Sequence, residues 1–393
     1  MSETASPTPP GPPGPGPTGA PIDRDRQWAG TMAGHPGREA HRAHAGAIAV
    51  GRAAARDRAE REDDEQLRLA PGATRAMGAG RRARPEAPDP LRTCFERDRD
   101  RILHAPAFRR LSGKTQVFVF PADHQRTRLT HALEVAQVAT AIADALGLNR
   151  TLTEAIALGH DCGHGPGGHA SEDAFSPYLA DGYDHAVWGA DVVLAPLNLC
   201  AETLDGIRNH SWSRPAPATP EAEVVAWADR IAYVCHDFED AVSAGIVVTD
   251  DLPDLVRERC GERRSGQIAR FIDGVVAATV RSGSVGMEPD LADALAEFRA
   301  FDYERIYLRP ASLAQADAVI RMLRALVEHY AALPALLTGP AGVPLAVPAG
   351  SPEAVRAAVT YVGGMTDRFA CDLAVARLGW PVGQLPRGVD LAA

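Results

Sequence analysis

The chain has 393 residues, of which 45% are apolar, so it is long enough for one large domain or two ordinary ones with a sizeable core. A formal net charge of -10 argues against a dedicated binder of nucleic acids or anionic membranes, whose affinity would come from basic residues. Residues 1–20 lack a signal-peptide core, and no stretch of about 18 apolar residues is present. The six cysteines contain no C-x-x-C pair, which predicts reduced thiols in a cytoplasmic protein.

Residues 1–90 are rich in proline, glycine and arginine and contain few large apolar side chains. Such a segment buries too little apolar surface to offset the entropy lost on ordering. We therefore predict a disordered segment over residues 1–90. From residue 91 to residue 393 apolar residues recur mainly at intervals of three and four, which predicts a single all-α domain.

A first helix is predicted from Arg128 to Leu146. His131, Val135 and Ile142 lie on its apolar face at helical spacing. His131 is therefore expected to point into the interior.

A second helix is predicted to begin with Thr151-Leu152-Thr153-Glu154, which has the pattern of a capping box. The residues that follow are apolar on all sides, which predicts a buried helix. It leads into His160 and Asp161, and a glycine-rich turn over residues 163–169 then ends it.

A third helix is predicted from Thr219, as the N-cap before a proline, to about Val242. It carries a stripe of polar side chains beside an apolar one. The stripe consists of Asp229, Tyr233, His236, Asp237 and Asp240. A helix that buries such a stripe is expected to line a site.

Two imidazoles and two carboxylates, from His131, His160, Asp161 and Asp229, form a mixed nitrogen and oxygen donor set on three inward-facing helices. This set suits one divalent ion, Mn²⁺ or Mg²⁺ first, with Fe²⁺, Co²⁺, Ni²⁺ or Zn²⁺ as alternatives. Each residue taken singly has a structural explanation. A lone buried histidine, for example, more often has its hydrogen bonds made within the core than binds a metal ion. The ordered combination favours a metal centre, which lowers the pKa of bound water and neutralises phosphoryl charge.

Further candidates follow in the glycine-rich turn and beyond it. His169 and Glu172 are three residues apart at an expected helix start, where the carboxylate can orient the imidazole as a general acid or base. A capping bond by the histidine is the structural alternative. His164 and His185 are expected either to contact phosphates or to hold the loop.

Basic residues before the first helix are candidates for phosphate contacts. Lys114 is the only lysine of the chain, which suggests that its position needs a compact ammonium group. The alternative is that Lys114 is an ordinary surface residue that is present by chance. Arg126 and Arg128 precede His131 and are expected to aim at the same pocket, or else to form an ordinary solvated charge pair.

From about residue 92 to residue 370 the chain resembles the bacterial deoxyguanosine triphosphate triphosphohydrolases, a family of HD-domain proteins. The segments that carry the resemblance are, in chain order, Asp98–His104, Ala107–Leu111, Lys114–Phe118, Arg126–His131, Leu133–Gln137, Glu154–Leu158, His160–His164, Gly168–Glu172, Ala228–Tyr233, His236–Asp237 and Gly364–Phe369.

The resemblance implies an all-α HD-domain helical bundle with additional helices, and members that commonly form tetramers or hexamers. It implies cleavage of a deoxynucleoside triphosphate between the α-phosphorus and the sugar O5′, which releases the nucleoside and triphosphate. The implied metal ligands are His131, His160, Asp161 and Asp229, and the implied catalytic residues are His169, Glu172 and His164. The implied substrate contacts are Arg128, Lys114 and His185 to phosphates, Tyr233 and Asp237 to the sugar, and Arg110 with Leu111 and Ser112 near C2′.

Two segments depart from the family pattern. Gly165-Pro166-Gly167 stands where relatives usually have Pro-Pro-Phe, which predicts a looser loop before His169. Residues 186–189 replace an Asn-Ala-Gln-Ser pattern and change the expected phosphate or base contacts after His185. Two other functions share the metal site: a nucleotidase or phosphoesterase acting on nucleoside monophosphates, and a regulatory nucleotide-binding or single-strand-binding protein with little turnover.

Overall fold

The computed structural model describes residues 28–30, 34–44, 46, 49–51, 54–78, 80–339 and 342–388. The chain forms two compact units, residues 1–55 and residues 56–393. In the first unit, the backbone amide of His35 donates to the carbonyl of Arg42 and the reverse bond is also present. Most of the first 50 residues of the predicted disordered segment lie outside the described residues. The second unit contains all the candidate site residues.

The prediction of disorder is wrong for the part of the N-terminal segment that belongs to the second unit. Helix α2 (Arg58–Arg68) forms there. The backbone amide and hydroxyl of Thr74 donate to the buried Glu221 carboxylate at 2.9 and 2.7 Å. Arg82 Nη1 donates to the buried Asp98 Oδ1 at 2.6 Å. Buried charge-assisted hydrogen bonds order this segment, and a test based on apolar content does not detect them.

The described part of the second unit contains helices and isolated bridges but no strand, which confirms the all-α prediction. The helices after α2 are α3 (Cys94–His104), α4 (Pro106–Arg110), α5 (Arg128–Leu146), α6 (Arg150–Gly159), α7 (Ala170–Phe175), α8 (His185–Trp188), α9 (Ala201–Asn209), α10 (Pro220–Ser243), α11 (Asp254–Cys260), α12 (Arg264–Ser282), α13 (Pro289–Asp302), α14 (Pro310–Ala332), α15 (Pro352–Gly363) and α16 (Asp367–Leu378). Short turns of π-helix cover Gly189–Val193 and Tyr303–Tyr307. None of the helices in the described residues is both long and apolar enough to cross a bilayer.

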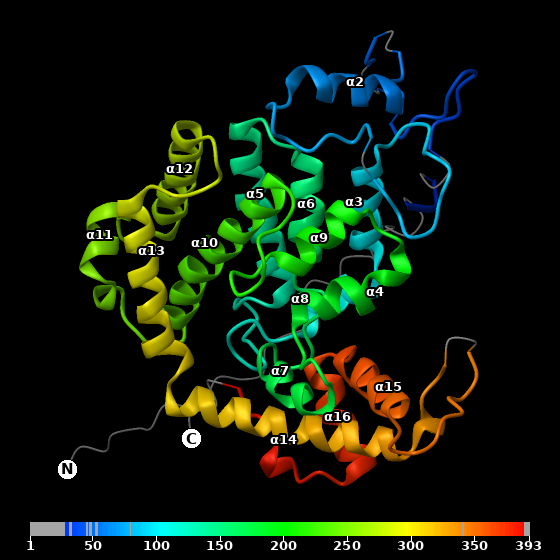
Figure 1. The fold of residues 1–393 in the computed structure, drawn as a ribbon, viewed down its shortest axis with the longest axis vertical. Helices are drawn as coiled ribbons and strands as arrows, with labels where there is room; N and C mark the ends of the chain where they lie inside the picture. Colours follow the sequence, from blue (N-terminus) through cyan, green and yellow to red (C-terminus); the bar gives the residue numbers. More distant parts are fainter. Residues whose placement is uncertain are drawn as a thin grey trace, which may run out of the picture. The chain divides into compact units, whose positions relative to one another are not determined.

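Helices α5, α6 and α10 lie side by side at the centre of the second unit (Figure 1). The bounds of α5 agree with the sequence prediction, and Gly147 ends it in the left-handed region at φ 65°. Helix α10 begins at Pro220, and the Thr219 side chain accepts from the amide of Ala222, as expected for an N-cap.

Helix α6 is buried from Ala155 to Gly159, as predicted, but it begins two residues earlier than the capping-box pattern indicated. Asn149 is the N-cap, and its side chain accepts from the Leu152 amide at 3.1 Å. The Thr153 hydroxyl is fully buried and donates to the Asn149 carbonyl. Thr151 therefore lies inside the helix, because asparagine competes well for the N-cap.

Two clusters of apolar side chains hold this unit together. The first packs around α5, α6 and α10 and includes Ile142, Ile156 and Ile231. The second packs around α14, α15 and α16 and includes Phe175 of α7 and Val319 of α14. Residues 163–169 connect α6 of the first cluster to α7 of the second, and the glycine-rich loop therefore spans the two.

Candidate functional site

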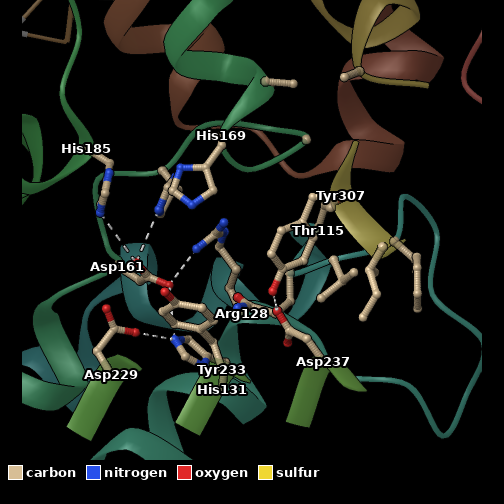
Figure 2. A pocket seen from close by; sticks show the side chains of 18 of the residues that line it. Thr115, Arg128, His131, Asp161, His169, His185, Asp229, Tyr233, Asp237 and Tyr307 are labelled. Carbon is tan, nitrogen blue, oxygen red and sulfur yellow. Dashed lines mark hydrogen bonds and ion pairs between the residues drawn. The ribbon is translucent and has the colours of Figure 1, made fainter. Parts of the chain in front are cut away.

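A cavity of about 430 Å³ contains most of the side chains that the sequence predicted for the site (Figure 2). Its walls come from α5, the loop after α6, α10, the turn after α13, and α14. The predicted residues that line it are Arg128, His131, Asp161, His164, His169, His185, Asp229, Tyr233 and Asp237. His160 and Glu172 lie directly behind this lining, in contact with it.

The four predicted metal ligands converge. His131 Nε2 lies 3.1 Å from Asp229 Oδ1 and 3.9 Å from Asp161 Oδ2. His160 Nε2 lies 3.4 Å from Asp161 Oδ1 and 3.8 Å from Asp229 Oδ1. Side chains from α5, the end of α6 and α10 therefore share one small volume, as the helix faces predicted.

The imidazole of His160 is held ready to bind a cation. Its Nδ1 donates to the Ala157 carbonyl at 2.6 Å, which leaves the lone pair on Nε2. Nε2 is buried and has no hydrogen-bond partner. A buried nitrogen acceptor costs free energy unless it is satisfied, and nearby carboxylates cannot donate to it. This orphaned atom and the mixed donor set both fit a divalent metal ion.

Arg128 is directed at the same place, as predicted, but it already has a partner. Its Nη1 donates to Asp161 Oδ2 at 2.6 Å, and both side chains are buried. Burial alone would raise the pKa of Asp161, but His160 and Arg128 hold that pKa well below its usual range. Asp161 therefore stays ionised and offers Oδ1 toward His160.

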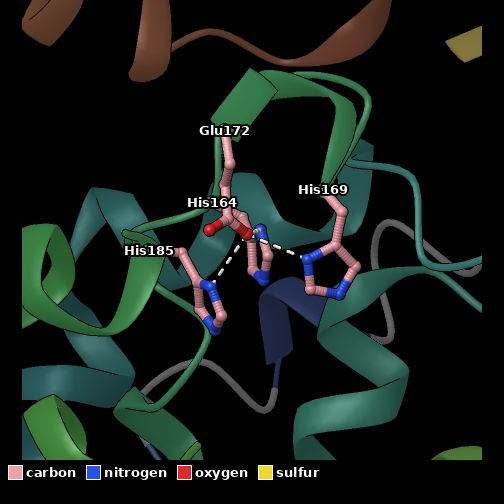
Figure 3. A group of neighbouring side chains, drawn as sticks. All are labelled: His164, His169, Glu172 and His185. Atoms are coloured by element: carbon pink, nitrogen blue, oxygen red, sulfur yellow. Dashed lines mark hydrogen bonds and ion pairs between the residues drawn. The ribbon is translucent and has the colours of Figure 1, made fainter. Parts of the chain in front are cut away.

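His169 and Glu172 form the predicted pair, and the carboxylate is shared with a second histidine (Figure 3). Glu172 Oε1 lies 2.9 Å from His169 Nδ1 and 3.0 Å from His185 Nδ1. Burial raises the pKa of Glu172, but the bonds from these two rings outweigh it and keep the carboxylate ionised. His164 stacks on His185 with ring centroids 3.7 Å apart. The His169 side chain is 75% exposed, so it alone of this group is freely accessible from the solvent.

Tyr233 and Asp237 line the cavity one and two turns along α10 from Asp229, on the face that the stripe predicted. The Tyr233 hydroxyl accepts from Arg299 Nε at 2.8 Å. The Tyr307 hydroxyl donates to Asp237 Oδ2. Burial raises the pKa of Asp237 to about 7.

This raised pKa predicts how stability depends on pH. The native carboxyl of Asp237 binds its proton more tightly than in the unfolded chain, where the pKa is near 3.8. Stability is therefore lost as the pH rises from about 4 to about 7. Asp237→Asn removes this loss, so its unfolding free energy relative to wild type should increase across that window, by about 1.4 kcal/mol per pH unit at most. Urea unfolding from pH 5 to pH 8 with a chelator present measures the difference, and a pH-independent difference would contradict it.

Two residues that were predicted to contact the substrate lie outside the cavity lining in this structure. Lys114 is buried outside the cavity lining, and its Nζ donates to the carbonyls of His164 and Gly363. Arg110 also lies outside the lining, and its Nε is buried without a hydrogen-bond partner. Burial lowers the pKa of both groups, that of Lys114 to about 8. Arg110 is the last residue of the short α4 helix, and Lys114 follows the turn Leu111–Gly113 that comes after it.

Arg126 does not reach the cavity either. Its guanidinium contacts Glu134 at 3.0 Å, Glu239 at 2.7 Å and Asp240 at 2.5 Å. His236 joins this group through Glu134 at 2.9 Å. The half of the α10 stripe formed by His236 and Asp240 therefore holds α5 and α10 together and takes no part in the cavity.

Sequence reasoning missed several residues of the lining. Gln116, His210, Arg230, Arg299 and Tyr307 all face the cavity. Gln116 lies two residues after Lys114, and Arg230 directly follows Asp229, so closeness in sequence to an assigned residue was an available signal. His210 Nδ1 donates to the Ile207 carbonyl at 2.8 Å, and burial lowers the pKa of His210 to about 4. Arg299 and Tyr307 come from a distant segment with no local signal.

Two regions of the chain match known protein families. The HD domain matches residues 128–234, and the phosphohydrolase-associated domain matches residues 285–375. The first region contains the four converging residues described above. The second region supplies Arg299 and Tyr307.

Curated relatives are similar to this chain over most of their own length. The chain is 39% identical over 320 residues to the deoxyguanosinetriphosphate triphosphohydrolase-like protein of Caldanaerobacter subterraneus subsp. tengcongensis, which covers 79% of this chain and 92% of that protein. The protein of the same name from Clostridium perfringens is 42% identical over 265 residues, covering 63% and 77%. The one from Syntrophus aciditrophicus is 35% identical over 376 residues, covering 79% and 94%. The chain therefore belongs to the deoxyguanosinetriphosphate triphosphohydrolase-like family of HD-domain phosphohydrolases.

Proposed function

We propose that this protein hydrolyses deoxynucleoside triphosphates to the deoxynucleoside and inorganic triphosphate, with one divalent metal ion bound by His131, His160, Asp161 and Asp229. The observation that carries the proposal is that one cavity joins this donor set to three guanidinium groups, those of Arg128, Arg230 and Arg299. A tripolyphosphate chain needs several cations near it, and the relatives are named for acting on such a substrate.

Two of these arginines have charge available for a phosphate. Arg230 Cζ lies 3.4 Å above the Trp212 ring, and its buried Nε has no hydrogen-bond partner. Arg299 Nε donates to the Tyr233 hydroxyl, a neutral group that leaves the charge of the guanidinium in place. Arg128 is partly neutralised by Asp161. The positive charge available to a phosphate in the cavity is therefore that of Arg230 on α10 and Arg299 on α13.

The metal ion would supply Lewis-acid polarisation of a phosphoryl oxygen and a lowered pKa for a bound water. In the proposed reaction, water adds at the α-phosphorus, the bond from that phosphorus to O5′ breaks, and O5′ takes up a proton. His169, the exposed member of the histidine group, donates this proton as a general acid. The ionised Glu172 carboxylate stabilises the imidazolium before transfer.

The rest of the cavity fits a deoxyribose and a base. Tyr233, Asp237 and Tyr307 form a polar side near the metal ligands, and their oxygen atoms can bond to a sugar hydroxyl. Val117, Val119, Ile306, Ala316 and Val319 supply apolar contact area for a base.

Product analysis tests the proposal. Each of the four deoxynucleoside triphosphates is incubated with purified protein and Mn²⁺ or Mg²⁺, and the products are separated by anion-exchange chromatography. Deoxynucleoside and triphosphate in equal amounts are expected. Release of orthophosphate or pyrophosphate would overturn the reaction, and orthophosphate from nucleoside monophosphates alone would assign a nucleotidase.

A further inference from the structure

Asp367, at the N-terminus of α16, contacts both the segment at Thr115 and the glycine-rich loop. Asp367 Oδ2 accepts from the Thr115 amide at 2.8 Å and from the Thr115 hydroxyl at 2.6 Å. Asp367 Oδ1 accepts from the Gly167 amide at 2.8 Å. One buried carboxylate thus joins a cavity wall to the loop that ends at His169.

A second contact pair fastens the other end of the same loop. Lys114 Nζ donates to the His164 carbonyl within the loop and to the Gly363 carbonyl at the end of α15. Gly363 and Asp367 both belong to the region matched by the phosphohydrolase-associated domain, and His164 and Gly167 both belong to the HD region. The loop is therefore held at residues 164 and 167 by the same C-terminal segment.

The space around the loop leaves little freedom. Gly167 and Gly168 both have positive φ, of 76° and 63°. A Cβ at Gly167 would lie 2.5 Å from Val319 Cγ1 of α14, and one at Gly168 would lie 2.8 Å from Arg128 Nη2. The missing aromatic residue of the family pattern predicted a looser loop. The contacts of Asp367 and Lys114 give this loop an anchor that does not depend on an aromatic side chain.

We propose that Asp367 is a positioning residue through which the C-terminal helices fix the conformation of residues 164–169 and so aim His169 into the cavity. The proposal rests on the proposed function only in that His169 takes part in the reaction. Asp367 itself does not line the cavity, so it acts through Thr115 and Gly167. All three groups that face Asp367 are donors, and the site therefore requires an acceptor on both oxygens.

Asp367→Asn tests this requirement with almost no change of volume. The amide has one acceptor oxygen and one NH₂ group, so either Gly167 or Thr115 must face a donor. We expect kcat to fall about 10- to 100-fold, the range that a misplaced reacting group causes, while KM changes less and metal content stays at the wild-type level. Hydrogen exchange of amides in residues 164–169 should become faster.

Asp372→Asn is the matched control, because it makes the same substitution at an exposed position of the same helix. It should leave kinetics and exchange unchanged. Thr115→Val removes only the hydroxyl donor and keeps the amide, so it should give a smaller change in the same direction. Should Asp367→Asn fail to fold, Thr115→Val carries the test alone.

The proposal would be overturned if amide hydrogen exchange in residues 164–169 were as slow in Asp367→Asn as in the wild-type protein. A loss of activity that only follows a loss of bound metal would also overturn it. The exchange measurement needs no substrate. The exchange measurement therefore tests the role of Asp367 separately from the proposed reaction. If the proposed reaction is wrong, the wild-type protein itself releases no triphosphate.

Discussion

Asp229→Asn is expected to remove the bound metal ion and to reduce phosphohydrolase activity by about a thousandfold or more. The substitution replaces an anionic ligand by a neutral amide, and the lost stabilisation of phosphoryl charge amounts to several kcal/mol, with about 1.4 kcal/mol for each tenfold change in rate. Asp229 Oδ1 lies within 4 Å of both His131 Nε2 and His160 Nε2. Burial would raise the pKa of Asp229, but the bond to His131 and the nearby histidines hold it below its usual range.

The measurement combines metal content, from inductively coupled plasma mass spectrometry, with product release. Asp240→Asn serves as the control, because Asp240 lies on the same helix but contacts Arg126 outside the cavity. It should keep both metal and activity. Full activity of Asp229→Asn with metal absent would show that this cluster is not the reactive centre.

His169→Gln is expected to lower kcat by about 10²- to 10⁴-fold, the usual contribution of general acid or base catalysis, with metal content unchanged. The His169 ring contacts Glu172 and is not one of the four converging donors. His104→Gln, an exposed substitution on α3, is the matched control and should be silent.

The leaving group gives this prediction a sharper form. A nitrophenolate ester of a nucleotide departs without needing a proton, so a general acid contributes little to its cleavage. The ratio of wild-type to His169→Gln rates should therefore be much smaller for the nitrophenolate ester than for a deoxynucleoside triphosphate. Equal ratios for the two substrates would assign His169 a role in binding, and unequal metal content would assign it to the metal site.

Helix faces were predictable from the sequence because their spacing is local. The inward direction of His131 follows from the period of α5, and the approach of Asp229 follows from the stripe on α10. The pairing of His169 with Glu172 also follows from a spacing of three residues. These elements carry the centre of the candidate site.

The remaining features of the candidate site depend on which distant segments of the chain pack together, and the sequence does not give this directly. The single lysine suggested a special role for Lys114, but its sequence context does not say that its partners are the carbonyls of His164 and Gly363. Arg299 and Tyr307 reach the cavity because α13 and the turn after it pack beside α10. Neither position has a local pattern that separates it from an ordinary surface residue.

The bonds between Thr74 and Glu221 bear on where a functional chain can begin. A polypeptide that started at the internal Met77 would lack α2 and Thr74. The fully buried Glu221 carboxylate would then lose two of its three hydrogen bonds and keep only the one from the Asn149 amide. Leaving a buried charge short of donors costs about 3 kcal/mol or more. Such a shortened product would retain every candidate site residue and yet fold less stably, so translation from Met77 would yield a weaker scaffold for the same chemistry.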